Sequence, residues 1–366
     1  MDVGNTELAR DSRRFGSRIR GCVVHPISDN VWMNSRLVHF ACCASLLVTL
    51  LAGALRAEDP TLRERVTRGL ALVERAARNY PTHRQCFSCH HQTLPLLAMR
   101  GAREVGLTID EPLLPAQLAF AQATFEKRKG ALLRGERTDG AAITVAYGLW
   151  TFQIADAKPS ELADAMVVNL LALQGAEGHW RPQSIRPPLA ESLVSCTVLS
   201  AYGLKQFARD EQQTAAEAAI SKGKAWLASA KLVGTEDFAF RLWGLQVLDG
   251  TREEVDRARQ ALLALQRADG GWAQLPDMES DAYATGQALY LLRECGLPIT
   301  ARAYERGAGF LRRTQETDGS WHVKTRARPV QIFFDNGDPH GKDQFISIAA
   351  TSWAIAALAP TIESTK

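Results

Sequence analysis

Residues 306–321, which read RGAGFLRRTQETDGSW, decide the fold of this 366-residue chain. The stretch begins with a basic and a small residue, followed by the aromatic–aliphatic pair Phe310-Leu311. It ends with Gln315, Gly319 and Trp321. Because internal repeats determine the architecture of a chain that contains them, we searched outward from this stretch for further copies.

Two more copies of the glutamine–tryptophan half lie upstream. Gln266 precedes Trp272, and Gln174 precedes Trp180, by the same six positions as in the last copy. Gln266 and Gln315 are 49 residues apart, and Gln174 and Gln266 are 92 apart, close to twice a period of about 46. The period predicts another copy between them, where residues 222–227 (KGKAWL) reproduce the first half. Residues 68–73 (RGLALV) resemble a degenerate first copy.

Each repeat unit contains an apolar-periodic helix, a glycine-rich polar loop and a second, more apolar helix. Ala and Leu dominate these segments, which favours helix over sheet. A single hairpin cannot bury both its helices, so neighbouring hairpins must stack. The sequence therefore predicts an all-α fold of six helical hairpins, closed as a ring or open as a solenoid. We expect the second helices near residues 91–105, 141–152, 189–207, 238–248, 282–295 and 346–359.

The repeat resembles the QW motif of prenyltransferase and squalene-oxidase repeat proteins, which belong to the terpenoid cyclase/protein prenyltransferase superfamily. The resemblance covers most of residues 60–360 and is strongest to squalene-hopene cyclase C-terminal domains. It implies an α/α toroid in which inner and outer helix rings close. Since a Gln at a helix end can cap the next helix and a Trp ring can stack on it, we interpret these residues as scaffold.

The N-terminal region has the pattern of a secretory signal peptide. Residues 37–55 are apolar apart from His39, follow Arg36 and end among small residues. We expect residues 1–57 to be an N-terminal extension and signal peptide, with Met33 a more conventional start than Met1. Residues 58–366 should form the toroid. The protein is then exported, to the periplasm or outside the cell, and meets a membrane only peripherally or through an uncleaved signal anchor.

The motif Cys86-Phe87-Ser88-Cys89-His90 is the sharpest chemical signal in the chain. Cys-x-x-Cys-His attaches c-type haem, because two thiols form thioethers to the vinyl groups and the histidine binds the iron. We therefore predict Cys86 and Cys89 as the anchors of a haem c, and His90 as its proximal ligand. The predicted export would take the chain to the compartment where such haem is attached.

Other interpretations of this motif remain open. Cys86, Cys89, His90 and His91 have the ligand types of a zinc site. Alternatively, Cys86 and Cys89 form a local disulfide in an oxidising compartment, or the segment is an ordinary loop.

Cyclase chemistry is indicated only weakly. The resemblance implies an Asp-x-Asp-Asp-Thr motif whose middle Asp protonates an alkene, and the nearest match is Asp281-Ala282-Tyr283-Ala284-Thr285. Tyr283 and Ala284 stand where the essential acids belong, so the acid does not carry over. Asp281 is a weak catalytic candidate, and an N-cap of a second helix explains it better.

Acids recur near the starts of the predicted second helices, and in a closed toroid they would surround one mouth of the cavity. They are Asp139, Glu191, Glu236, Asp237, Asp281 and Asp343. Favourable interaction with the helix dipole explains such acids without a catalytic role. The loop at residues 322–344 is long for a compact domain and suits either a lid or a structured cap whose two Phe rings pack on the toroid.

Three functions follow from these patterns. The first is an exported toroid with a covalent haem, in redox service with a redox partner. The second is a terpenoid-cyclase-like enzyme acting on an isoprenoid or another apolar small molecule in the central cavity. The third is a non-catalytic binding or scaffold toroid. A net charge of +3 gives no reason to expect a nucleic-acid partner.

Overall fold

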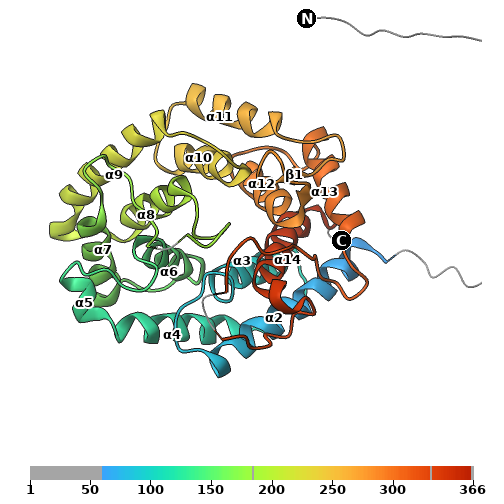
Figure 1. The fold of residues 1–366 in the computed structure, drawn as a ribbon, viewed down its shortest axis with the longest axis horizontal. Coiled ribbons are helices and arrows are strands. Elements are labelled where there is room, and N and C mark those ends of the chain that lie inside the picture. The colour runs from blue at the N-terminus through green and yellow to red at the C-terminus, as the bar shows by residue number, and fades with distance from the viewer. Residues whose placement is uncertain (1–59, 184, 330–331, 364–366) are drawn as a thin grey trace, which may run out of the picture. The chain divides into compact units, whose positions relative to one another are not determined.

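Two concentric rings of helices form the computed structural model of the chain, which describes residues 60–183, 185–329 and 332–363 (Figure 1). The outer ring contains α2 (Leu62–His83), α4 (Leu113–Glu126), the short α5 (Lys129–Leu133), α7 (Glu161–Leu173), α9 (Gln213–Ser229), α11 (Arg252–Ala264) and α13 (Arg302–Thr314). The inner ring contains α3 (Thr93–Glu104), α6 (Ala142–Ile154), α8 (Leu193–Phe207), α10 (Thr235–Val247), α12 (Ala282–Glu294) and α14 (Gln344–Leu358).

Short elements complete the chain between the helices. They are the 3-10 helices η1 (Asp210–Gln212), η2 (Gly341–Asp343) and η3 (Ala359–Thr361), and the antiparallel strands β1 (Trp272–Ala273) and β2 (Ser280–Asp281). The predicted all-α fold of six hairpins is confirmed. The predicted signal peptide, the domain boundary after residue 57 and the start at Met33 lie outside the described residues.

The ring is closed. Each inner helix packs against the next, and α14 packs against both α3 and α2, so the last hairpin contacts the first. The closed toroid, which the periodicity alone left open, is therefore the observed arrangement.

The inner helices are rich in apolar residues because most of their surface is buried. In α14 all residues but Phe345 are buried, whereas α13 places its arginines and Glu305 outward and buries one face. The segment Gly341–Thr361 around α14 is long and apolar enough to cross a membrane, but 83% of its most apolar window is buried inside the toroid. It is a core helix of the inner ring.

The repeat residues connect one hairpin to the next. The Gln315 side chain donates to the carbonyl oxygens of Gly319 and of Arg65 in α2, both at 2.9 Å. The Trp321 indole donates to Leu311 O at 2.8 Å. A Cβ on Gly69 of α2 would lie 3.2 Å from the Trp321 ring, so only glycine leaves room for it. The last repeat therefore contacts α2, the first helix of the outer ring, through Gln315 and Trp321.

The other copies make the same contacts. Gln174 and Gln266 each bridge their own loop glycine and the next outer helix, at 2.7–2.9 Å. Trp180 and Trp272 pack against Gly223 and Gly307 of the following outer helix. Basic–glycine pairs recur at residues 68–69, 222–223 and 306–307. The glycine of each pair therefore provides the surface on which the tryptophan of the preceding repeat packs.

Candidate active site in the central cavity

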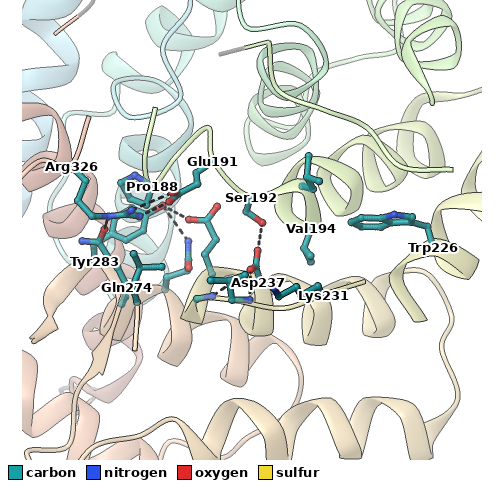
Figure 2. Close-up of a pocket in the computed structure, with 17 residues that line it drawn as sticks. Pro188, Glu191, Ser192, Val194, Trp226, Lys231, Asp237, Gln274, Tyr283 and Arg326 are labelled. Carbon is teal, nitrogen blue, oxygen red and sulfur yellow. Dashed lines mark hydrogen bonds and ion pairs between the residues drawn. The ribbon is translucent and has the colours of Figure 1, made fainter. Parts of the chain in front are cut away.

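A cavity of about 330 Å³ opens at the N-terminal ends of α8, α10 and α12 (Figure 2). Its wall is largely apolar, and a few polar groups converge on it, as is typical of small-molecule sites. The lining residues that matter below are Glu191, Trp226, Glu236, Gln274, Tyr283, Gln287 and Arg326. A second cavity of about 340 Å³ lies at the opposite ends of the inner helices, among Trp150, Tyr202, Trp243 and Tyr290.

Most of the acids predicted around this mouth are helix caps or ion-pair partners. Asp139 forms an ion pair with Arg128, and Glu191 forms one with Arg326. Asp237 accepts from the backbone N–H groups of Val233 and Gly234, and Asp281 accepts from that of Ala284. Asp343 binds His322 and accepts from the Thr325 backbone N–H. The N-cap interpretation of Asp281 is confirmed, because its carboxylate accepts the Ala284 N–H at 2.9 Å at the start of α12. Burial raises the pKa of this carboxyl to about 6.

Glu236 is the exception among these acids. It is the second residue of α10, lines the cavity and is only 8% exposed. The Tyr283 hydroxyl donates to its Oε2 at 2.9 Å, while Oε1 has no hydrogen-bond partner among the described residues. Burial raises the pKa of this carboxyl to about 7. A carboxyl that titrates near neutral pH inside a cavity has the properties of a general acid.

Two further polar atoms near Glu236 lack partners within the described part of the chain. These are Oε1 of Gln287 and the hydroxyl of Tyr147. The Gln287 amide donates to the Tyr283 hydroxyl at 3.4 Å, and burial together with the Glu236 carboxyl raises the pKa of Tyr147. Since buried polar groups are nearly always hydrogen-bonded, unpartnered atoms gathered at one place indicate a bound ligand or water.

Arg326 closes part of the cavity mouth from the last long loop (Figure 2). Its guanidinium binds both carboxylate oxygens of Glu191, which stands just before α8, and donates from Nε to Gln274 Oε1 at 2.8 Å. This bidentate pair ties the loop across the starts of the inner helices. Of the two Phe rings of this loop, Phe334 packs against Tyr80 and Phe345, whereas Phe333 is 61% exposed. The predicted cap, in which both rings pack on the toroid, is therefore correct for Phe334 and wrong for Phe333.

The Cys-x-x-Cys-His motif forms the turn that begins α3. Burial raises the pKa of the Cys89 thiol to about 12, and burial together with Arg186 lowers the pKa of His90 to about 3. Both side chains are therefore neutral at physiological pH. The Glu236 carboxyl also contributes to the raised pKa of Cys89, so the motif approaches the polar group of the cavity.

The other motif residues are engaged inside the protein. The Cys86 sulfur lies 3.2 Å from the Tyr80 hydroxyl. His91 is completely buried, with Nδ1 at 3.1 Å from Ser88 Oγ and Nε2 at 2.9 Å from the Asn336 amide nitrogen. His91 could bind a metal ion only by breaking one of these hydrogen bonds.

No family model matches the chain. Over 96 residues it is 31% identical to squalene-hopene cyclase of Schizosaccharomyces japonicus, a match that covers 21% of this chain and 14% of the length of that protein. A type II terpene cyclase from Scytonema, solved with geranylgeranyl dihydroxybenzoate, has a TM-score of 0.51 at 15% identity, covering 82% of this chain and 98% of that one. The fold is that of the squalene-cyclase-like α/α toroids. A solved glycosidase shares it, with a TM-score of 0.56 at 11% identity, covering 82% of this chain and 99% of that one.

Within this squalene-cyclase-like toroid, the predicted haem was tested against the packing around its motif. Neither of the two cavities described above is lined by Cys86, Cys89 or His90. The His90 ring lies between the His91 and Phe345 rings, with centroids 4.7 and 5.3 Å away. The residue types suit a haem, and Cys86, Cys89 and His90 are each only partly buried. Haem attachment stays a prediction from the motif.

The alternatives at the motif also stay predictions. Cys86 and Cys89 are free thiols in the structure. The four proposed zinc ligands do not form a group whose ligand atoms all lie within 4.8 Å of one another in the described residues. A different group meets that criterion, as described below.

A haem stain decides between these interpretations. If the motif attaches haem c, protein made in a host competent for cytochrome c assembly should keep its haem in a denaturing gel. Because both thioether bonds are then absent, the double variant Cys86→Ser, Cys89→Ser should lose the stain. A colourless wild-type protein from such a host would contradict the prediction.

Sequence reasoning overlooked several residues of this site. Arg326, Gln287 and Tyr147 were not singled out, and Glu236 was grouped with the helix-start acids. One signal was available at Glu236-Asp237. Only the second of these acids stands three positions after Gly234, where it can complete a capping arrangement. The first is therefore free for another role.

Proposed function

We propose that this toroid is a terpenoid-cyclase-like enzyme that acts on an isoprenoid or similar apolar molecule in the central cavity, with Glu236 as the proton donor. The observation that carries the proposal is the buried Glu236 carboxyl, whose Oε2 accepts from the Tyr283 hydroxyl at 2.9 Å and whose Oε1 has no hydrogen-bond partner among the described residues. Tyr283 stands at the position that the family resemblance assigns to the catalytic acid. A carboxyl from the neighbouring helix α10 would then supply the missing acid.

The acid strength restricts the substrate. A carboxyl with a pKa of about 7 is too weak to protonate an isolated alkene at a useful rate, whereas an ether or epoxide oxygen accepts a proton far more readily. We therefore propose a substrate with such an oxygen at its reacting end. Proton transfer from Glu236 breaks the C–O bond, a nearby double bond attacks the resulting cation, and proton loss from carbon restores Glu236. The net reaction is an isomerisation.

The surrounding residues support this chemistry. The Tyr283 hydroxyl and Gln287 amide hold the carboxyl in place, since both belong to α12 and form a chain of hydrogen bonds to it. Leu193, Val194 and Trp226 provide apolar wall for a hydrocarbon body. The Arg326–Glu191 pair restricts access of water at the mouth.

Conversion of epoxide-bearing isoprenoids by purified protein tests the proposal. We expect cyclised product from the wild type and none from Glu236→Gln, because the amide has no acidic proton. Asp281→Asn is the matched control, since asparagine also caps helices and Asp281 does not line the cavity. Squalene itself, which has no oxygen, should give no polycyclic product.

Three results would contradict the proposal. Equal activity in Glu236→Gln, or loss only in Asp281→Asn, would exclude Glu236 as the acid. Saturable binding without conversion in the wild type would favour the non-catalytic binding toroid.

A further inference from the structure

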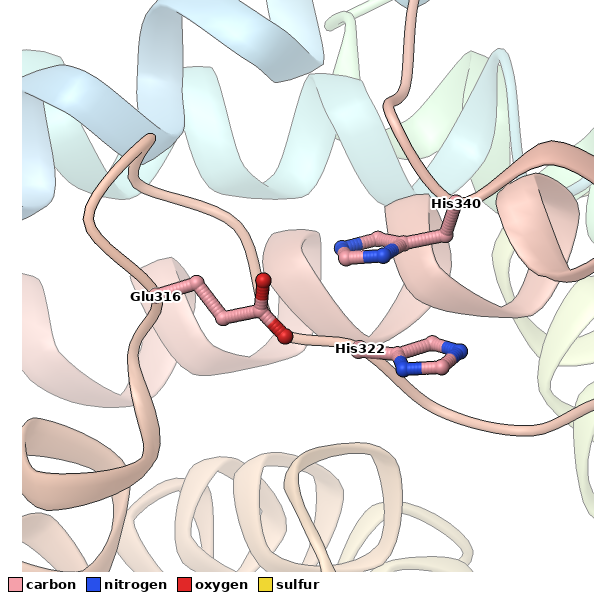
Figure 3. Close-up of side chains that lie close together, drawn as sticks. All are labelled: Glu316, His322 and His340. Carbon is pink, nitrogen blue, oxygen red and sulfur yellow. The ribbon is translucent and has the colours of Figure 1, made fainter.

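A group of metal-ligand types lies at the base of the long loop between α13 and α14, outside the central cavity. Glu316 and His322 lie near the start of this connection and His340 lies near its end (Figure 3). One ligand atom from each of these three side chains lies within 4.8 Å of the other two. Among the described residues, this is the one group of histidine, cysteine and acidic side chains whose ligand atoms all lie within 4.8 Å of one another.

Both histidines are held by partners of the kind that orient metal ligands. His322 Nε2 lies 3.0 Å from Asp343 Oδ2, and His340 Nε2 lies 2.8 Å from Ser320 Oγ. Within the described part of the chain, Nδ1 of neither ring forms a hydrogen bond. Metal-binding histidines typically use one ring nitrogen for the ion and the other for a carboxylate or hydroxyl, which fixes the tautomer.

The two imidazole rings lie face to face. Their centroids are 4.4 Å apart and their planes are 7° from parallel. Because a metal ion lies near the plane of each imidazole that binds it, one ring must turn before both can bind the same ion.

A buried carboxylate oxygen beside the group has no partner. Asp338 is 4% exposed, its Oδ1 accepts the His340 N–H at 3.0 Å, and its Oδ2 has no hydrogen-bond partner in the described structure. An unpartnered buried carboxylate oxygen is costly, and a divalent cation bound nearby would reduce that cost.

We propose that Glu316, His322 and His340 bind one divalent transition-metal ion, with Zn²⁺ the best match. Two imidazoles and one carboxylate suit zinc better than magnesium or calcium, which prefer all-oxygen sites. Zinc–ligand bonds of about 2.0–2.2 Å require the three ligand atoms to draw together. Glu316 and His322 are exposed and can rotate to do so.

The site would clamp the loop rather than catalyse a reaction. Glu316 and His322 come from the start of the loop and His340 from its end, so the ion would join the two ends, and Arg326 between them bridges the cavity mouth. Joining the two ends of a long loop reduces the number of conformations that the loop can adopt, which lowers its conformational entropy. The inference is independent of the proposed enzymatic function.

Metal binding by the full-length chain tests this inference. Zn²⁺ titrated into metal-free wild-type protein should bind at one equivalent and protect the loop from limited proteolysis. His322→Ala and His340→Ala should each weaken binding by about 100-fold or more, and Asp343→Asn by roughly 10–100-fold through the orienting contact. His83→Ala, which removes an exposed histidine elsewhere, is the matched control and should bind as wild type. Thermal midpoints without metal establish that each variant folds.

Cobalt separates this site from the cysteine motif. Co²⁺ bound by nitrogen and oxygen ligands gives visible d–d bands without the intense near-ultraviolet band of a thiolate–cobalt bond. We expect the same spectrum from wild type and from the Cys86→Ser, Cys89→Ser variant. A thiolate band, loss of binding only in that cysteine variant, unchanged affinity in both His322→Ala and His340→Ala, or no binding by wild type would each overturn the proposal.

Discussion

Trp321→Ala should lower the free energy of unfolding by about 3–5 kcal/mol, the range for removing a large buried ring from a site that cannot collapse. The ring is 1% exposed, packs on Gly69 of the first helix and donates to Leu311 O. Its removal therefore leaves a cavity at the joint where the ring of hairpins closes, and the Leu311 carbonyl keeps only the longer hydrogen bond from the Thr314 hydroxyl, at 3.4 Å. Chemical denaturation measures the loss.

Two comparisons define this prediction. Trp272→Ala, which removes the equivalent ring from a joint inside the chain, should cost a similar amount. Trp226→Ala is the control, because that ring is only partly buried at the cavity wall and should cost less. Amide hydrogen exchange should accelerate in α2 for Trp321→Ala and in α13 for Trp272→Ala. Unchanged unfolding in both variants would contradict the structural role of the repeat tryptophans.

Glu236 should make the protein less stable as pH rises. The folded-state pKa is about 7, above the ordinary value of 4.5 for an unfolded chain. Between these values the folded state keeps a proton that the unfolded state has lost, so stability falls as pH increases. Above pH 7 both states are ionised and the full penalty of a buried carboxylate remains. The difference between the folded and unfolded pKa values of Glu236 corresponds to a loss of about 3 kcal/mol in the free energy of unfolding.

Comparison with Glu236→Gln isolates this effect. Asp281 and Asp338 also have raised pKa values, so the wild-type curve alone reflects several groups. The difference in unfolding free energy between wild type and Glu236→Gln cancels the others. From pH 4.5 to pH 8 it should shift against the wild type by about 3 kcal/mol. A difference that does not vary with pH would mean that the carboxyl is solvated or paired.

The fold was largely predictable because its signal repeats along the chain. The six inner helices were located from the repeat period and their apolar pattern, although α8 begins at Leu193 instead of residue 189 because Ser192 caps it. Closure could not be derived from periodicity, since an open solenoid has the same local pattern. It depends on contacts such as Gln315 to Arg65, which join residues 250 positions apart.

The site was less predictable because its residues converge only in three dimensions. Glu236, Tyr283 and Tyr147 come from three inner helices, and the sequence pattern of each helix explains an acid or a tyrosine without reference to the others. Arg326 lies in a loop with no periodicity, so nothing local indicates that it reaches Glu191. The Cys-x-x-Cys-His motif shows the opposite case. The motif is conspicuous in the sequence, yet His91, the residue that follows it, is hydrogen-bonded within the protein core.

Closure of the ring through Trp321 and Gly69 has a consequence for how this architecture can vary. An open array of repeats can gain or lose a unit at either end, provided that its terminal units are capped. Here every hairpin has a neighbour on both sides, so there is no end at which to add one. A seventh hairpin would have to enter between two existing neighbours and widen the whole inner ring, which would enlarge the central cavity. If it entered between α10 and α12, it would also separate Glu236 from Tyr283. With six hairpins, the size of the cavity is set by the side chains of the helices and loops that line it.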